Sequence, residues 1–177
     1  MSTIEDANTI VYLDRTGTGN ETSASARAQT ILQRRKSRAG RSLELHAREI
    51  FTEEKLVEGT DFSHQPESEA GKSPDFLFPS ESAYKDPQFP QDRLRMLAVK
   101  TTVKDRWRQI LNEANRVQQK HLLTLQEAIS KTQFREMFDA RVTLVVPKPI
   151  MEKFPPSVQP YLQTLESFIG DVRFLRL

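Results

Sequence analysis

The pattern of apolar and polar residues predicts five helices, over residues 26–37, 42–56, 105–119, 132–140 and 158–169. In the second, third and fifth of these, apolar side chains recur every three or four positions, as on the buried face of an amphipathic helix. Gly40 separates the first two helices, and Ser42 is the N-cap expected for the second. The apolar face of the last helix is expected to hold Tyr161, Leu162, Leu165 and Phe168.

Short apolar runs predict five strands, at residues 8–13, 75–78, 94–103, 122–125 and 142–146. In the third strand the side chains alternate between two faces. One face holds Leu94, Met96, Ala98 and Lys100, and the other holds Leu97 and Val99. Because strands and helices alternate along the chain, the sequence predicts an α/β domain with a mixed central sheet flanked by helices.

The composition excludes several classes of protein. The chain has 177 residues and no cysteine, so a disulfide framework, a thiolate zinc site and a cysteine nucleophile are all excluded. No apolar run is long enough to span a membrane, and we expect a cytoplasmic protein with no membrane partner. No glycine-rich phosphate loop occurs, so nucleotide hydrolysis has no support. Residues 14–25 are predicted to be a loop, and residues 1–26 are expected to be a poorly ordered N-terminal segment.

The charges are segregated along the chain. Residues 27–48 carry seven Lys or Arg and one acid, and residues 49–92 carry eleven acids and three Lys. Residues 100–120 carry six Lys or Arg and two acids. Basic faces beside a few carboxylates suit a ligand that has a phosphate backbone. Solvated helix faces are the equally weighted alternative.

Asp75, Lys100 and Glu113 form the strongest candidate for a chemical site. Hydrolysis of a phosphodiester needs an activated water and neutralisation of negative charge, which carboxylates, Mg²⁺ and a lysine together supply. Asp75 opens one predicted strand, and Lys100 lies on the next one, across the proline-rich loop 80–92. Many metal nucleases carry an acid two residues before such a lysine, where this chain has Ala98.

A second carboxylate must therefore come from elsewhere. Glu113 borders the apolar stripe of the predicted helix that follows Lys100, and Glu44 borders the stripe of an earlier helix in the same way. Taken singly, a Pro-Asp pair before a strand is usually a turn, and a glutamate at a helix edge is usually solvated. A lysine at the end of an apolar strand is less common and needs a carboxylate or phosphate partner.

The segment LAVKTTVKDRWRQILNEA (residues 97–114) resembles the catalytic-domain family of the EcoRII and PspGI restriction endonucleases, in the PD-(D/E)xK superfamily. The resemblance extends upstream through RRKSRAGRSLELH (34–46) and PDFLFPS (74–80). It continues downstream through KHLLTLQEAIS (120–130) and LVVP (144–147). It covers about residues 30–170 and implies a restriction-endonuclease-like fold, with residues 27–177 as the catalytic domain.

The resemblance implies roles for single residues. In this branch the acid before the lysine is lost and a glutamate 13 residues after it takes its place, which matches Ala98 and Glu113. Asp75 and Glu113 are then ligands of Mg²⁺, and Lys100 positions the attacking water and the scissile phosphate. Further residues that match the family are Glu44, as a catalytic and metal-binding residue, Lys104 and Arg106, as phosphate contacts, and Tyr84, whose role the resemblance leaves open.

The resemblance also implies the substrate and the partners. It implies a homodimer that cuts double-stranded DNA at a near-palindromic, CCWGG-like site, with a cognate DNA methyltransferase in the same system. An arginine-rich segment of this branch reads guanines, and Arg side chains suit the O6 and N7 atoms of guanine. The candidates for DNA contact here are Arg34, Arg35, Arg38 and Arg41. Contact with phosphate alone is the alternative for each of them.

Two other functions remain as alternatives to a type II restriction endonuclease. One is a DNA-binding remnant that no longer cuts, since the region before the first predicted helix is short and unlike the family. The other is a repair nuclease that uses the same site on mismatched DNA. The presence of Asp75, Lys100 and Glu113 favours a cutting enzyme, and the arginine-rich segment 34–41 favours sequence readout over mismatch repair.

Overall fold

The computed structural model describes residues 21–175. They divide into a first unit that ends at Arg38 and a second unit that begins at Ala39. The predicted strand 8–13, the loop as far as residue 20 and the expected disorder of residues 1–20 lie outside the described part. Helix α1 (Glu21–Glu53) is 33 residues long, and its residues from 39 onward belong to the second unit. No helix among the described residues is long and apolar enough to cross a membrane.

The prediction of two helices separated at Gly40 was wrong, and so was the loop over residues 21–25. A glycine inside a helix costs only about 1 kcal/mol relative to alanine, which is too little to end a helix between good helix-forming neighbours. Ser42 is accordingly an internal residue of α1 and not an N-cap.

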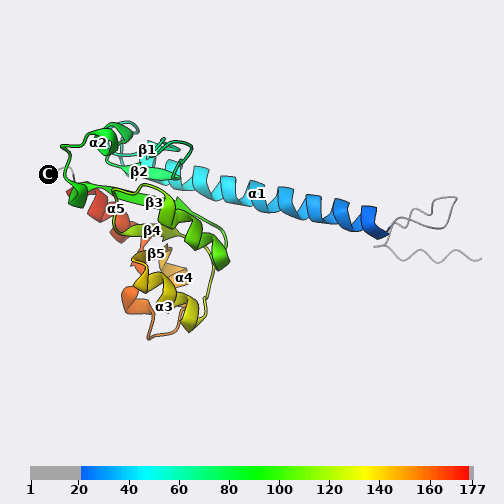
Figure 1. The fold of residues 1–177 in the computed structure, drawn as a ribbon. Coiled ribbons are helices and arrows are strands. Elements are labelled where there is room, and N and C mark those ends of the chain that lie inside the picture. Colours follow the sequence, from blue (N-terminus) through cyan, green and yellow to red (C-terminus); the bar gives the residue numbers. More distant parts are fainter. Residues whose placement is uncertain (1–20, 176–177) are drawn as a thin grey trace, which may run out of the picture. The chain divides into compact units, whose positions relative to one another are not determined.

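The second unit is built on a six-stranded mixed sheet in the order β1-β2-β3-β4-β5-β6 (Figure 1). The first three strands are antiparallel, and β3 to β6 run parallel. The strands are β1 (Ser63–His64), β2 (Phe76–Phe78), β3 (Arg95–Val99), β4 (Lys120–Leu123), β5 (Val142–Val146) and β6 (Gln163–Thr164). The remaining helices are α2 (Glu81–Lys85), η1 (Gln91–Arg93), η2 (Lys104–Asn112), α3 (Lys131–Asp139), α4 (Lys148–Met151), η3 (Gln159–Tyr161) and α5 (Leu165–Phe174).

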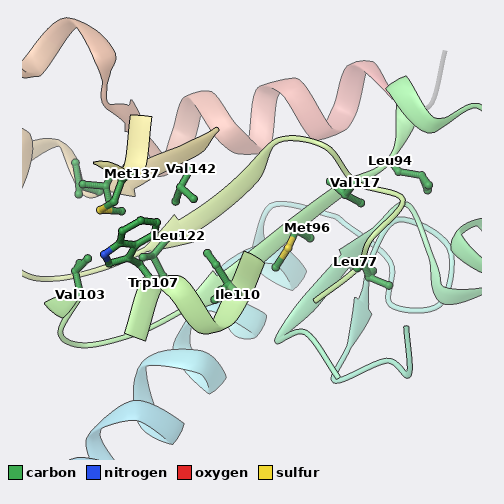
Figure 2. Close-up of a cluster of buried hydrophobic side chains, with 14 of the residues drawn as sticks. Leu77, Leu94, Met96, Val103, Trp107, Ile110, Val117, Leu122, Met137 and Val142 are labelled. Atoms are coloured by element: carbon green, nitrogen blue, oxygen red, sulfur yellow. The ribbon is translucent and has the colours of Figure 1, made fainter. Parts of the chain in front are cut away.

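Each face of the sheet is covered by its own apolar cluster, as the alternation in β3 predicts. Met96 and Ala98 pack with Trp107 and Ile110 of η2 on one face, which Figure 2 shows in close-up. On the other face, Leu97 and Val99 pack with residues of α5 and of the end of α1. The prediction of an α/β domain with a mixed sheet is therefore confirmed.

Two helices were predicted too long. The segment 105–119 is the 3-10 helix η2 followed by a turn, in which Ala114 has a φ of 48°. The segment 158–169 contains η3, strand β6 and only the start of α5, because residues 163–164 pair with β5 at the edge of the sheet. Tyr161, predicted to face inward, has 54% of its surface exposed, whereas Phe168 is buried as predicted.

The loop predicted over residues 80–92 contains a short helix. The Ser80 hydroxyl accepts a hydrogen bond from the Ala83 N–H at 3.1 Å and so caps α2. Strand β5 agrees with the prediction, and α3 differs from it by one residue at each end.

Phe51 is the centre of an aromatic cluster that joins α1 to the sheet. Its ring lies 5.5 Å from Phe62, 5.2 Å from Phe76 and 5.5 Å from Phe78, and the side chain is fully buried. We expect Phe51→Ala to lower the free energy of unfolding by about 3–5 kcal/mol, because it leaves a cavity between helix and sheet. Urea denaturation measures this value. The matched control is Phe174→Ala, at a phenylalanine that is 74% exposed, and a comparable loss there would contradict the assignment.

Candidate active site

Asp75 and Lys100 form an ion pair at the point where β2 begins and β3 ends. The antiparallel register pairs Phe76 with Leu97, which brings the residue before β2 beside the end of β3. The Lys100 Nζ donates to Asp75 Oδ2 at 2.9 Å, and the Val99 N–H donates to the same oxygen at 2.6 Å. The Asp75 and Lys100 side chains are 15% and 22% exposed, so the pair is mostly buried but open to solvent on one side.

Glu113 belongs to the same electrostatic neighbourhood. It is the residue after η2, in extended conformation, and not a residue of a helix as predicted. Burial raises the pKa of the Glu113 carboxyl; the Lys100 ammonium opposes this rise, and the Asp75 carboxylate adds to it. The structure therefore brings the three residues singled out from the sequence into one neighbourhood.

Lys120 holds the backbone that carries Glu113. Its side chain is buried, and its Nζ donates to the carbonyls of Glu113 and Ala114, both at 2.6 Å. Burial lowers the pKa of Lys120 to about 8, against the opposing effect of the Glu69 and Glu113 carboxylates. This lysine replaces the helical hydrogen bonds that the turn lacks.

Glu44 is linked to Asp75 through an intermediate residue. It is 9% exposed, and its Oε1 accepts from His64 Nε2 at 2.6 Å and from Gln65 Nε2 at 2.8 Å. The Gln65 N–H in turn donates to the Asp75 carbonyl at 2.9 Å. Within residues 21–175, no three acids or histidines are grouped closely enough to hold a metal ion, so Glu44, Asp75 and Glu113 do not form a preassembled three-ligand cluster.

Tyr84 is buried at 3% exposure and lies away from solvent. Its hydroxyl donates to Glu69 Oε1 and accepts from the Arg116 N–H at 3.3 Å. Burial, together with the Glu69 carboxylate, raises the pKa of Tyr84 to about 12. Burial also acts to raise the pKa of Glu69, but the hydrogen bonds from Tyr84, Ser68 and the Asn115 N–H hold it below its usual value.

The predicted DNA contacts are all on exposed positions. Lys104 and Arg106 of η2 are exposed, and the Lys104 carbonyl accepts from Gln133 Nε2 at 2.7 Å. The arginines of the basic segment in α1 are exposed as well, namely Arg34, Arg35, Arg38 and Arg41. Exposure leaves these side chains accessible to a polyanion.

Four residues near Glu113 were not predicted from the sequence, namely Glu69, Lys72, Arg116 and Lys120. Lys120 could have been singled out from the sequence, because it begins an apolar strand. A lysine there needs a carboxylate, phosphate or other polar partner, as Lys100 does. Glu69 and Lys72 lie in the irregular segment 58–73, where no periodicity indicates which side chains turn inward.

The chain matches known proteins over most of its length. The family model described as EcoRII C terminal matches residues 9–169. The type II restriction enzyme EcoRII of Escherichia coli is 51% identical over 163 residues, which are 92% of this chain and 40% of that protein. The chain thus spans two fifths of the length of this relative.

Two restriction endonucleases of known structure share the fold. Metal-depleted Ecl18kI in complex with uncleaved DNA has a TM-score of 0.67 and 22% identity, over 84% of this chain and 49% of the Ecl18kI chain. A complex of PspGI with substrate DNA has a TM-score of 0.64 and 17% identity, over 88% of this chain and 70% of the PspGI chain. The prediction of a restriction-endonuclease-like fold is confirmed.

The burial of Glu113 has a consequence for stability. Because its pKa is raised in the folded chain, folding favours the protonated carboxyl, and stability falls as the pH rises through the window above the ordinary glutamate value. Glu113→Gln removes the charge. We expect this variant to be more stable than the wild type at pH 7.5 in EDTA, with a gain that shrinks toward pH 4.

Urea denaturation at the two pH values measures the gain. The matched control is Glu127→Gln, at an exposed glutamate that pairs with Lys153. A gain for Glu113→Gln that is equal at both pH values, or absent at pH 7.5, contradicts the effect of burial.

Proposed function

The chain belongs to the EcoRII C-terminal family, and we propose that it is a type II restriction endonuclease that hydrolyses double-stranded DNA with Mg²⁺. One observation carries the proposal: the partly exposed Asp75–Lys100 pair at the end of β3 lies close enough to Glu113 for both charges to act on the pKa of its carboxyl. Two carboxylates and a lysine are what phosphodiester hydrolysis with a divalent cation requires.

The donor set fits a hard divalent cation. Among the described residues, both hydrogen bonds to the Asp75 carboxylate end on Oδ2, which leaves Oδ1 for a ligand. Glu113 is disfavoured as an anion in its buried position, and a cation beside it offsets that cost. Asp75 and Glu113 would therefore hold Mg²⁺, which prefers carboxylate oxygens. Metal-depleted Ecl18kI, which shares the fold, is in complex with uncleaved DNA, and this supports the proposal of a metal here.

In the proposed reaction, different residues of the chain have different roles. In hydrolysis a new P–O bond forms to the oxygen of water while the ester P–O bond breaks, and the leaving oxygen takes up a proton. Lys100 is held by Asp75, so its ammonium is fixed where negative charge grows on the phosphate. When bound, Mg²⁺ supplies charge neutralisation and lowers the pKa of water. Lys104 and Arg106 contact the flanking phosphates.

We further propose a CCWGG-like site, read by a homodimer. The support is the 51% identity to EcoRII and the exposed arginines of α1, whose guanidinium groups match the major-groove edge of guanine. A two-fold symmetric dimer matches a near-palindromic site. An enzyme of this kind would cut the DNA of its own cell, so we propose a cognate DNA methyltransferase as a functional partner.

Cleavage of plasmid DNA tests the proposal. We expect discrete fragments in Mg²⁺ and none in EDTA, and we expect Lys100→Ala to cut at least about 100-fold more slowly, because a positioned charge on the transition state is lost. Gel electrophoresis over time measures the rate. The matched control is Lys153→Ala, at an exposed lysine that pairs with Glu127, and it is expected to cut like the wild type.

Other results of the cleavage assay would indicate one of the two alternative functions. A wild type that binds DNA but never cuts it in Mg²⁺ is the non-cleaving remnant. Cutting restricted to mismatched duplexes indicates the repair nuclease. Sequencing of the ends of the fragments tests the CCWGG-like site.

A further inference from the structure

We propose that Glu69 and Tyr84 are positioning residues that fix the turn 113–116 and thereby hold the Glu113 carboxylate in place beside Asp75. The inference rests on the proposed function and assigns to Tyr84 a role other than contact with DNA or with the reacting phosphate. The turn has few hydrogen bonds of its own and is held by side chains from a distant part of the chain.

The turn is an uncommon conformation that needs external support. η2 ends at Asn112, Glu113 is extended, and Ala114 has a φ of 48°, in the left-handed region that residues with a Cβ rarely occupy. Such conformations persist when the surrounding contacts determine them. A small shift of this turn moves the Glu113 carboxylate directly.

Glu69 supplies support from the irregular segment before β2. Its Oε1 accepts from the Asn115 N–H at 2.8 Å and from the Tyr84 hydroxyl, and its Oε2 accepts from Ser68 Oγ at 2.7 Å. Ser68 also accepts from the Ala114 N–H at 3.4 Å. One carboxylate thus joins the turn, the helix α2 and the segment 68–72.

The Tyr84 hydroxyl is hydrogen-bonded both to Glu69 and to the backbone of the turn. The hydroxyl proton is donated to Glu69, and the oxygen accepts from the Arg116 N–H at 3.3 Å. With 3% of its surface exposed and its one O–H donated to Glu69, the side chain has no donor to present to DNA. The Tyr84 hydroxyl therefore forms its hydrogen bonds within the protein.

Arg116 completes the attachment from the other direction. Its guanidinium donates to the carbonyls of Tyr84, Asp86 and Phe89, the last two at 2.8 Å. Its Cζ lies 5.7 Å from the centre of the Tyr84 ring. The Arg116 side chain therefore anchors the turn to the segment 84–89, while Glu69 and Tyr84 bind the backbone of the turn.

Metal affinity tests the positioning role directly. The probe is Mn²⁺, titrated calorimetrically into the full chain without DNA. We expect Tyr84→Phe, which keeps the ring, and Glu69→Ala to weaken Mn²⁺ binding about tenfold and to slow Mg²⁺-dependent cleavage by a similar factor. Affinity for uncleaved DNA in EDTA is expected to stay at the wild-type value. Matched controls are Tyr161→Phe, at an exposed tyrosine, and Glu67→Ala, at an exposed neighbour of Glu69.

A double substitution separates positioning from general structural damage. In a Glu113→Ala background, Tyr84→Phe is expected to leave the residual Mn²⁺ affinity unchanged, because the group that it positions is gone. A further loss of Mn²⁺ affinity in that background overturns the proposal. If Glu69→Ala fails to fold, as judged by circular dichroism, Tyr84→Phe decides alone.

The remaining outcomes are also decisive. If the wild type cuts DNA and Tyr84→Phe binds Mn²⁺ and cuts like it, the positioning role is overturned and the proposed function stands. If Tyr84→Phe loses DNA affinity in EDTA but keeps its Mn²⁺ affinity, Tyr84 contacts DNA and the proposal is wrong. If the wild type neither cuts DNA nor binds Mn²⁺, the proposed function fails and the inference fails with it.

Discussion

The antiparallel pairing of β2 with β3 is the constraint on which the site depends. Because Phe76 lies opposite Leu97, the carboxylate of Asp75 meets both the N–H of Val99 and the ammonium of Lys100. Side chains on a strand alternate between faces, so a shift of one residue in this register would send Lys100 to the opposite face from Asp75. The aromatic cluster around Phe51 packs on the face of the sheet that carries Phe76 and Leu97. This packing holds β2 and β3 in the observed register.

The site collects charges that the folded chain only partly compensates. The charges that act on Glu113 are the carboxylate of Asp75 and the ammonium groups of Lys72, Lys100 and Lys120, and the carboxylate of Glu69 acts on Lys120. Burial disfavours the charge on Glu113 and on Lys120, so the arrangement costs stability in the absence of a ligand. A site that is stabilised by the groups it binds is expected in an enzyme, where function and stability are often in conflict.

The candidate site was predictable to different degrees for its different parts. Asp75 and Lys100 were singled out because each adjoins a short run with a clear apolar pattern, and in the structure they lie just before β2 and just after β3. Glu113 was singled out at the edge of a predicted helix, whereas the structure places it after a 3-10 helix in a turn. Glu69 could not be predicted, because its partners Tyr84 and Asn115 lie 15 and 46 residues away in the sequence and no local pattern relates them.

The sequence by itself determined the class of fold, the two faces of β3 and the identity of the charged residues, because apolar periodicity and residue chemistry are local properties. It also determined membership of the family, through the segment 97–114 and its flanks. Only the tertiary structure decided where helices end. Residues 163–164 joined the sheet, and the turn after Asn112 formed around Lys120. The physical reason is that each of these choices depends on hydrogen bonds or packing between segments far apart in the chain, and such contacts outweigh local preferences of about 1 kcal/mol.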